Sequence, residues 1–555
     1  MRSPGPPSDG RKPPAPPPVP PPALPVRATK PPVVPVPRPA PRVKWSLLMY
    51  RALQTDFESL PQLLAARAGE IGGERFVRDA EIEWTYGEFH ERVMEVAAGL
   101  RELGVGQGDV VGVVLPNSPH YLEVWWAILW LGAIFNPVNP ALTAREAVGI
   151  LADSEAVVAV CTPEAAAGLE AHRDELPSLR EIVAADGDPA APLRGRGSVG
   201  EHAVVGPGDL CAFVYTSGTT GRPKGAMLGH GNFLANAWQL GEPLPISRGD
   251  TLGMVLPLFH VNAQLVTTVI PLVLGAQVAM WERFSASRFW ADVARFEPVT
   301  FSSVPTMLAA LLHAPGADEA ESNSLRFVIC GAAPLSPALF RRFEEKFGLK
   351  IMEGYGLTEG TCCTTINPFT GPRKIGSVGL PTRAQDVAII DEAGDPVPDG
   401  TAGEVCFRGP NMMHGYYKRP DANAETMVDG WVRTGDVGYR DEDGYFFLVD
   451  RTKDMIIRGG ENIYPREIED VLLEHDSVKE AAVVGRPDEV RGEEVHAVVA
   501  LVAGEDVAVL EEHCRARLAA FKVPTSWEVV EELPKTSTGK IDKKPLREKL
   551  AAASG

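Results

Sequence analysis

Apolar, β-rich runs alternate with helical patterns from about residue 55 to about residue 450. Alternation over such a length predicts mostly parallel sheets with helices packed on their faces, the arrangement of α/β proteins. The strands that this pattern predicts are Val110–Leu115, Ala156–Val160, Cys211–Val214, Gln277–Met280, Thr300–Ser303 and Arg326–Cys330. The helices that it predicts between them include Thr85–Leu103, Tyr121–Leu131 and Pro337–Phe347.

The pattern changes after residue 385. Short strands separated by Gly and Asp turns predict a more antiparallel subdomain, with strands at Val387–Ile390, Gly403–Arg408 and Gly444–Val449. Beyond Lys453 the pattern is α+β over about 100 residues, enough for a small domain. A chain of 555 residues is too long for one core, so several domains are expected. We predict a tail over residues 1–43, a large domain over 44–452 and a small domain over 453–555.

Residues 1–43 hold 18 of the 50 prolines and are rich in Lys and Arg. Such a tract cannot form helices or sheet ladders and has little to bury, which predicts a disordered, polyproline-like tail. It could dock on a proline-binding domain, but a dispensable extension is the simpler interpretation, and Met49 is an alternative start.

Composition excludes several classes of protein. The formal net charge of −19 argues against nucleic acid as a partner. The seven cysteines form no C-x-x-C pair, which argues against zinc and disulfides and indicates a cytoplasmic protein. The apolar runs Val124–Phe135 and Leu265–Trp281 are too short or too interrupted for a transmembrane segment, which needs roughly 20 residues. We interpret them as a buried helix and a buried helix–strand pair.

Residues 215–228 form a glycine-rich loop that follows a predicted buried strand. Gly218, Gly221 and Gly225 allow backbone N–H groups to converge, as in a nest that binds phosphate oxygens. Hydroxyl groups of Ser217, Thr219 and Thr220 add donors, and Lys224 adds a positive charge. The spacing does not fit a Walker A loop. Composition alone leaves a flexible surface loop as an equal alternative.

The full string Tyr215–Leu228 resembles the phosphate loop of the adenylate-forming superfamily, which includes acyl-CoA synthetases. Five further motifs follow in the order of that family. They are Glu353–Glu359 (adenine and magnesium), Thr434–Asp436 (ribose), Asp450–Asp454 (hinge), Gly459–Pro465 (a loop typical of acyl-CoA ligases) and Pro534–Ile541 (catalytic lysine). The resemblance also extends upstream to about residue 58.

The resemblance implies a fold of two stacked, mostly parallel sheets, a small barrel-like subdomain and a mobile α+β C-terminal domain. It also implies a ligase that works in two steps. A carboxylate attacks the α-phosphate of ATP to give acyl-AMP and pyrophosphate, and the thiol of coenzyme A then displaces AMP. The implied cofactors are ATP, Mg²⁺ and coenzyme A as co-substrate.

The resemblance also assigns roles to residues. Catalysis falls to Lys540, Thr358, Glu359 and His260, with Glu359 as the magnesium ligand and His260 as a wall of the acyl pocket. Lys453 falls at the hinge. Nucleotide or coenzyme A binding falls to Thr216, Ser217, Gly218, Thr219, Thr220, Gly221, Lys224, Gly331, Ala332, Ala333, Glu353, Gly354, Tyr355, Gly356, Thr358, Asp436, Arg451, Gly459, Gly460 and Lys540.

The acid itself is less constrained. The expected pocket wall is mostly apolar and offers no Asp or Arg to hold an amino acid's second charge, which favours a fatty or arylalkenoic acid. Two alternatives remain open. The acyl group could pass to the pantetheine of an acyl carrier protein or to another nucleophile, or the chain could be a non-catalytic ATP-binding scaffold that uses its proline-rich tail.

Overall fold

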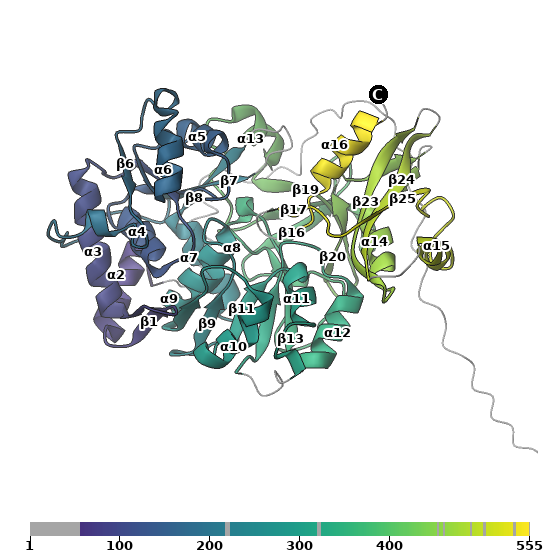
Figure 1. Cartoon of the computed structure of the whole chain (residues 1–555), viewed down its shortest axis with the longest axis horizontal. Coiled ribbons are helices and arrows are strands. Elements are labelled where there is room, and N and C mark those ends of the chain that lie inside the picture. Colours follow the sequence, from purple (N-terminus) through teal and green to yellow (C-terminus); the bar gives the residue numbers. More distant parts are fainter. Residues whose placement is uncertain are drawn as a thin grey trace, which may run out of the picture.

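The computed structural model describes residues 56–216, 223–318, 324–451, 454–458, 461–488, 491–502, 507–536 and 540–553. The predicted tail therefore lies outside the described residues. We call the elements from α2 to β20 the large domain and those from β21 to α16 the small domain. The small domain lies to one side of the large one, next to β16, β17, β19 and β20 (Figure 1).

Six strands form the first sheet, which is parallel except for the β7–β8 hairpin. In spatial order they are β6 (Glu181–Ala184), β5 (Val158–Cys161), β3 (Val110–Val114), β4 (Ile134–Pro137), β7 (Leu210–Thr216) and β8 (Lys224–Gly229).

Nine strands form the second sheet, which has a parallel centre and antiparallel edges. Their order is β15 (Leu380–Pro381), β14 (Thr365–Ile366), β13 (Lys350–Tyr355), β12 (Phe327–Cys330), β11 (Thr300–Ser303), β9 (Thr251–Met254), β10 (Gln277–Met280), β1 (Arg75–Arg78) and β2 (Glu83–Thr85).

Helices of the large domain pack around and between these sheets. They are α2 (Leu60–Ile71), α3 (Tyr86–Glu102), α4 (Pro119–Trp130), α5 (Ala144–Asp153), α6 (Pro163–Glu170), α7 (His230–Gly241), α8 (Val261–Gln264), α9 (Ile270–Leu274), α10 (Ala286–Phe296), α11 (Pro305–Leu311), α12 (Pro337–Phe347) and α13 (Pro420–Thr426). Short 3-10 turns occur at Arg173–Glu175, Ala191–Leu193 and Thr358–Gly360, and a π-helical turn, η3, at Leu265–Val269.

Local sequence explains where several helices begin and end. The Glu88 N–H donates to the Thr85 hydroxyl, and the Thr85 N–H donates to the Glu88 carboxylate. These two hydrogen bonds form a capping box for α3. Helix α12 begins after Ser336, whose hydroxyl accepts from the Leu339 N–H, and ends at Gly348 in a left-handed conformation.

The main core lies between the two large sheets. Every residue of α4 is buried, and Trp125, Trp126 and Trp130 are among the largest fully buried side chains. The same apolar cluster includes residues of β3, β9 and η3, so it joins both sheets. The run Val124–Phe135 is thus confirmed as a buried helix leading into a strand. The run Leu265–Trp281 is confirmed as helical turns leading into β10.

A third sheet completes the large domain and confirms the predicted antiparallel subdomain. It contains β16 (Asp386–Ile390), β17 (Gly403–Arg408), β19 (Trp431–Arg440), β18 (Met427–Val428) and β20 (Phe446–Arg451).

The small domain is α+β, as predicted. Its sheet contains β22 (Glu461–Ile463), β21 (Ile456–Arg458), β24 (Gly492–Leu501), β23 (Val478–Asp488) and β25 (Ser526–Val530). Its helices are α14 (Pro465–Leu473), α15 (Val507–Arg515) and α16 (Lys543–Ala553). Apolar clusters cover both faces of the sheet, one including residues of α14 and α15 and the other Leu546 of α16.

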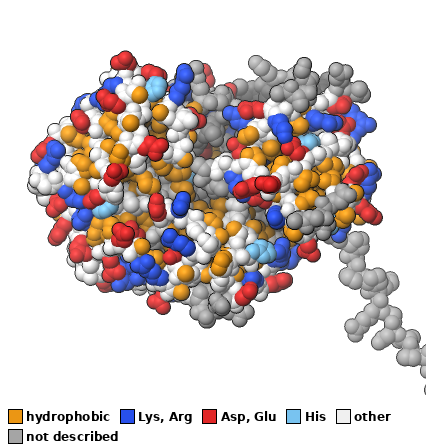
Figure 2. All heavy atoms as spheres, viewed as in Figure 1, with side chains coloured by type: hydrophobic (Ala, Val, Ile, Leu, Met, Phe, Trp, Pro, Cys, Tyr) orange, Lys and Arg blue, Asp and Glu red, His pale blue; other side chains and the backbone are white. Residues whose placement is uncertain are grey.

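Charged groups of both signs are interspersed over the face seen in Figure 2, with hydrophobic side chains scattered among them. No helix of the described residues is long and apolar enough to cross a membrane. All seven cysteines lie in described segments and are free thiols, as predicted from their spacing.

Candidate active site

The β7–β8 hairpin holds the ends of the glycine-rich loop. Thr216 and Lys224 are paired across the hairpin, so the chain between them leaves and re-enters the sheet at one point. Ser217, Gly218, Thr219, Thr220 and Gly221 lie outside the described residues, and their predicted contact with phosphate stays a prediction. Lys224 is half-buried, and its Nζ lies 5.2 Å from the centre of the Tyr416 ring.

An extended segment at residues 413–417 runs beside β8. The His414 N–H donates to the Met227 carbonyl over 2.8 Å, and the Tyr417 N–H donates to the Gly225 carbonyl over 2.8 Å. This pairing places Tyr416 between the glycine-rich hairpin and the turn that follows β13.

Tyr416 reaches Glu359 on that turn. Its hydroxyl donates to Glu359 Oε1 over 2.5 Å, and burial together with the Glu359 charge raises the pKa of Tyr416 well above its usual range. Tyr416 thus stays a hydrogen-bond donor. Lys224, Tyr416 and Glu359 form one connected group, although the sequence analysis did not identify Tyr416. No motif marks this tyrosine, because the contact depends on a strand pairing between distant segments.

The turn that carries Glu359 is held by hydrogen bonds from the segment at residues 411–413. The Met413 N–H donates to the Glu359 carbonyl over 2.8 Å, and the Asn411 side chain donates to the Gly360 carbonyl over 2.8 Å. Glu359 is 8% exposed. A fixed carboxylate beside the hairpin has the donor chemistry of a Mg²⁺ ligand, so the predicted metal role fits the residues present. Thr358 precedes Glu359 in the same short turn and is half-buried.

Two further predicted residues meet at the end of β13. The Tyr355 hydroxyl donates to Asp436 Oδ2 over 2.6 Å, and Asp436 lies on β19. The Asp436 N–H donates to Thr434 Oγ1 over 3.1 Å, which fixes the turn around the carboxylate. Asp436 is also paired with Arg451 of β20 in the sheet register. Tyr355, Asp436 and the Arg451 backbone therefore converge, and their predicted roles at adenine and ribose stay predictions.

A tight layer of backbone joins the ends of β12 and β13. A Cβ atom on Gly331 would lie 2.9 Å from the Gly354 carbonyl oxygen, and one on Gly356 would lie 1.8 Å from that of Cys362. Ala332 has a left-handed φ of 69°. Ala333 follows it and is half-buried. Small residues are therefore required for these segments to approach so closely, and Gly356 adjoins Tyr355 in the chain.

His260 of the large domain lies within electrostatic reach of Lys540 of the small domain. His260 precedes α8 and is half-buried, and its Nε2 has no hydrogen-bond partner within the described part of the chain. Burial first, and then the charge of Lys540, lower the pKa of His260 to about 3. His260 is therefore neutral near pH 7, and the structure holds Lys540 within electrostatic reach of it.

The Lys540 loop is closed at its base by backbone contacts. The Thr536 N–H donates to the Lys540 carbonyl over 2.7 Å, and the Lys540 N–H donates to Thr536 Oγ1 over 3.2 Å. Gly459 and Gly460 lie outside the described residues. They join β21 to β22, which are paired antiparallel. Because the two glycines are not described, their predicted contact with coenzyme A also stays a prediction.

Glu353 differs in surroundings from the other predicted nucleotide-site residues. It is 2% exposed, and its Oε2 atom has no hydrogen-bond partner among the described residues. Burial raises the pKa of Glu353 to about 8, and the charge of Arg466 on α14 opposes this shift. The positive charge that acts on Glu353 in this arrangement thus comes from Arg466 of the small domain.

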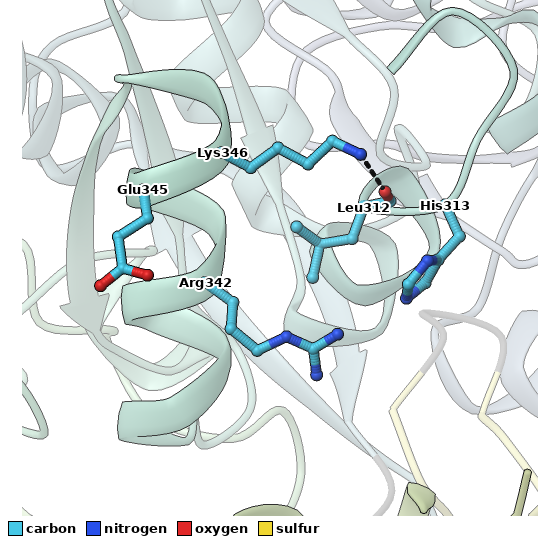
Figure 3. A pocket seen from close by; sticks show the side chains of 5 residues that line it. All are labelled: Leu312, His313, Arg342, Glu345 and Lys346. Carbon is cyan, nitrogen blue, oxygen red and sulfur yellow. Dashed lines mark hydrogen bonds between the residues drawn. The ribbon is translucent and has the colours of Figure 1, made fainter. Parts of the chain in front are cut away.

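Two other features of the large domain do not belong to this site. A surface hollow of about 370 Å³ lies between the end of α11 and α12, where Lys346 Nζ donates to the Leu312 carbonyl (Figure 3). It includes none of the predicted site residues. Among the described residues, His120, Glu123 and Asp188 place possible metal-ligand atoms within 4.8 Å of one another. Arg194 donates to both carboxylates over 2.7–3.0 Å, so we interpret this group as a structural ion cluster.

Comparison with known proteins agrees with this geometry. Residues 64–417 match the family model of the AMP-binding enzyme, and residues 467–540 match that of the AMP-binding enzyme C-terminal domain. A feruloyl-CoA synthase of Amycolatopsis sp. is 40% identical over 480 residues, covering 85% of this chain and 95% of the relative. A sulfoacetate–CoA ligase of Cupriavidus necator is 36% identical over 502 residues, covering 88% and 97%.

A solved structure shares the fold as well. ATP-bound MatB from Rhodopseudomonas palustris superimposes with a TM-score of 0.83 at 31% identity, covering 88% of this chain and 98% of that one. The predicted fold class, a large domain of mainly parallel sheets followed by an α+β C-terminal domain, is thereby confirmed.

Proposed function

The chain belongs to the AMP-binding enzyme family and is an AMP-forming acid–thiol ligase, and on that premise we propose that it converts an apolar fatty or arylalkenoic acid to its coenzyme A thioester. In the first step a carboxylate oxygen attacks the α-phosphorus of ATP, and pyrophosphate leaves. In the second step the sulfur of coenzyme A attacks the acyl carbon, and AMP leaves.

The group formed by Lys224, Tyr416 and Glu359 carries the proposal, and the charge of Lys540, which acts on His260, supports it. An ammonium group at the wall of the acid site can neutralise charge as two anions are brought together. Lys540 would lie between the carboxylate and the α-phosphate. A neutral His260 would form part of the acyl wall without adding a second positive charge.

The remaining roles follow from the chemistry of each group. The loop from Ser217 to Lys224 would hold the β- and γ-phosphates, with Thr358 contacting the same phosphates. Tyr355 would provide a flat face for adenine, and Asp436 would accept hydrogen bonds from the ribose. When bound, Mg²⁺ supplies charge neutralisation at the phosphate oxygens, and Glu359 is the residue that would hold it.

The nature of the acid is the least constrained part of the proposal. Val261 and Ala263 of α8 and Cys330 at the end of β12 support an apolar acyl group, and Asn262 and Gln264 of α8 are the polar residues beside them. The relatives named above act on different acids by their names, feruloyl and sulfoacetyl, so family membership alone does not choose between them. Those names support coenzyme A as the acceptor and give no support to a carrier protein.

A screen of pyrophosphate release over fatty, arylalkenoic and short polar acids, with and without coenzyme A, tests the proposal. We expect release with apolar acids and thioester formation that requires coenzyme A. A preference for short polar acids would refute the substrate class. Thioester formation only on a carrier protein would refute the acceptor, and ATP binding without turnover of any acid would favour a scaffold.

Glu359→Gln tests the metal assignment in the same assay. The change keeps the shape of the side chain and removes its charge. Loss of one such group typically lowers the rate by on the order of 100-fold or more. Turnover close to that of the unchanged enzyme at saturating Mg²⁺ would remove Glu359 from the metal site.

A further inference from the structure

Arg466 lies where the small domain meets the large domain. It belongs to the first turn of α14, and its side chain is 9% exposed. Its Nη1 donates to the Leu448 carbonyl over 2.8 Å, and its backbone N–H donates to Asp450 Oδ2 over 3.1 Å. Both partners lie on β20 of the large domain, so a single buried residue makes two hydrogen bonds across the boundary.

Arg466 also acts on the nucleotide side of the large domain. Its charge lowers the pKa of Glu353, the buried carboxyl on β13 that precedes Gly354 and Tyr355. Helix α14 packs against both α12 and β20, so the Arg466 side chain is enclosed between the two domains. Figure 1 shows α14 beside β20, on the side of the small domain that faces the large one.

Neighbouring charged side chains make different contacts. Lys522 binds Glu467 over 2.6 Å, and Lys543 binds Glu469 over 2.7 Å. Both of these ion pairs lie within the small domain and would move with it as a unit. Arg466 Nε also lies 3.7 Å from Asp470 Oδ2 within α14, whereas the hydrogen bonds of Arg466 to β20 depend on how the two domains are placed.

We propose that Arg466 is the positioning residue that docks the small domain in the arrangement that brings Lys540 to His260. This inference rests on the proposed function, in which that arrangement performs the first step. A buried guanidinium is stable only while its hydrogen-bond acceptors stay in place. Any rotation of the small domain would move Arg466 away from Leu448 and from buried Glu353. Arg466 therefore stabilises the docked arrangement selectively, and its loss should shift the population toward other arrangements.

Arg466→Met tests this directly, because it keeps most of the apolar stem and the backbone bond to Asp450 and removes the charge and the side-chain donor to Leu448. We expect the kcat of pyrophosphate release to fall about 10-fold with little change in the KM for ATP. Thioester formation from synthetic acyl-adenylate and coenzyme A should be unchanged or faster. Arg466→Lys, which retains the charge, should recover part of the lost rate.

Arg517→Met is the matched control. Arg517 pairs with Glu474 over 3.4 Å at the other end of α14, within the small domain, and both side chains are largely exposed. This variant should leave both steps unchanged. Equal losses in both steps for Arg466→Met, or a melting temperature of this variant below that of the native protein, would show a general structural role. Either result would overturn the proposal. Unchanged kinetics would also overturn it.

Hydrogen exchange separates this inference from the proposed function. Arg466→Met should speed amide exchange in β20 and in α12 where α14 covers it, and Arg517→Met should not. Faster exchange in an enzyme that activates no acid would support docking by Arg466 while the proposed function fails. Exchange unchanged in an active enzyme would overturn the docking role alone.

Discussion

Single charges at the site act over distances that the sequence does not reveal. Burial lowers the pKa of His260 and the charge of Lys540 adds to that shift, while burial raises the pKa of Glu353 and the charge of Arg466 opposes that shift. In each pair one residue belongs to the large domain and the other to the small domain. The electrostatics of the site therefore depend on the relative placement of the domains, and pKa values become direct reporters of that placement.

Lys540→Ala should impair one step and spare the other. Without the ammonium group, adenylate formation should fall by about 100-fold or more, since charge between carboxylate and α-phosphate is no longer neutralised. With synthetic acyl-adenylate and coenzyme A supplied, thioester formation should stay close to normal. If both rates fall together, Lys540 serves folding or general binding.

The same variant should also change the titration of His260. Removing the Lys540 charge should raise the pKa of His260 from about 3, while burial keeps it below the ordinary value of 6.5. Histidine NMR of the Lys540→Ala protein measures this, with the native protein as the reference. An unchanged pKa would mean that the two residues do not meet in solution.

Glu353→Gln should make stability less dependent on pH. The carboxyl has an ordinary pKa of 4.5 and a folded-state pKa of about 8, so between these values the folded chain holds a proton that the unfolded chain has lost. The free energy of unfolding of the native protein therefore falls as pH rises through this window, by up to about 1.4 kcal/mol per pH unit. The charged groups facing Glu353 are Arg466 and Asp470 of α14, with the Cys330 thiol beside it.

Denaturant unfolding from pH 4 to pH 9 measures this difference. The variant should gain stability over the native protein steadily from about pH 4.5 to about pH 8 and then hold a constant margin. Asp470, whose pKa is raised to about 6, contributes equally to both proteins and cancels. Parallel curves over the whole range would show that Glu353 is ionised in the folded protein.

Strand ends and the turns after them build most of the site. In the six-stranded sheet β7 ends and β8 begins at the glycine-rich loop, and in the nine-stranded sheet β12 and β13 end at the Gly331 segment and the Glu359 turn. Parallel strands bring such ends to one edge of a sheet, where ligands of α/β proteins bind. The antiparallel β19 then adds Asp436 from a different sheet. The geometry of these backbone segments is as important as the side chains they carry.

Gly356→Ala should disrupt this backbone layer. A Cβ atom would lie 1.8 Å from the Cys362 carbonyl oxygen, so the turn between β13 and Glu359 would have to move. We expect a clear loss of melting temperature and of adenylation. Gly149→Ala is the control, because that glycine lies inside α5 with nothing within 4 Å of the new Cβ. It should stabilise the protein by about 0.5–1 kcal/mol through helix propensity. Equal melting temperatures for the two variants would contradict the close approach.

Two domains of different size meet around one site. The large domain contributes the hairpin, the Glu359 turn and Asp436, and the small domain contributes Lys540 and Arg466. Among the described residues, the hydrogen bonds across the boundary include those of Arg466 to β20, and we predict that the small domain can adopt more than one arrangement at a modest cost in free energy. Two arrangements of the small domain would allow a carboxylate to attack in the first step and a thiol to attack in the second.

Deleting residues 1–43 should leave the enzyme intact. Eighteen prolines and few apolar side chains larger than valine predict no packed contact for this segment. The melting temperature and both rates should match those of the full chain. A loss of several degrees, or of turnover, would show that the tail docks on the folded domains.

Local pattern was sufficient for many elements of this chain. The predicted segments Gln277–Met280, Thr300–Ser303, Pro337–Phe347 and Gly403–Arg408 agree with β10, β11, α12 and β17 residue for residue. Hydrophobic periodicity and end signals such as Ser336 and Gly348 are properties of neighbouring residues, so the sequence contains them. The π-helical turn Leu265–Val269 was not predicted, because its local pattern does not differ from that of an α-helix.

Motifs in the sequence identified the residue types of the site, and the fold decided which of them meet. Tyr355 and Asp436 were both identified by motifs and are joined by a hydrogen bond in the structure, whereas the bond from Tyr416 to Glu359 and the crossing contacts of Arg466 had no signal in the sequence. Each of these contacts joins segments that are far apart or lie in different domains. Their formation depends on strand order and domain docking, which are set by the burial of the whole apolar core and not by any short stretch of the chain.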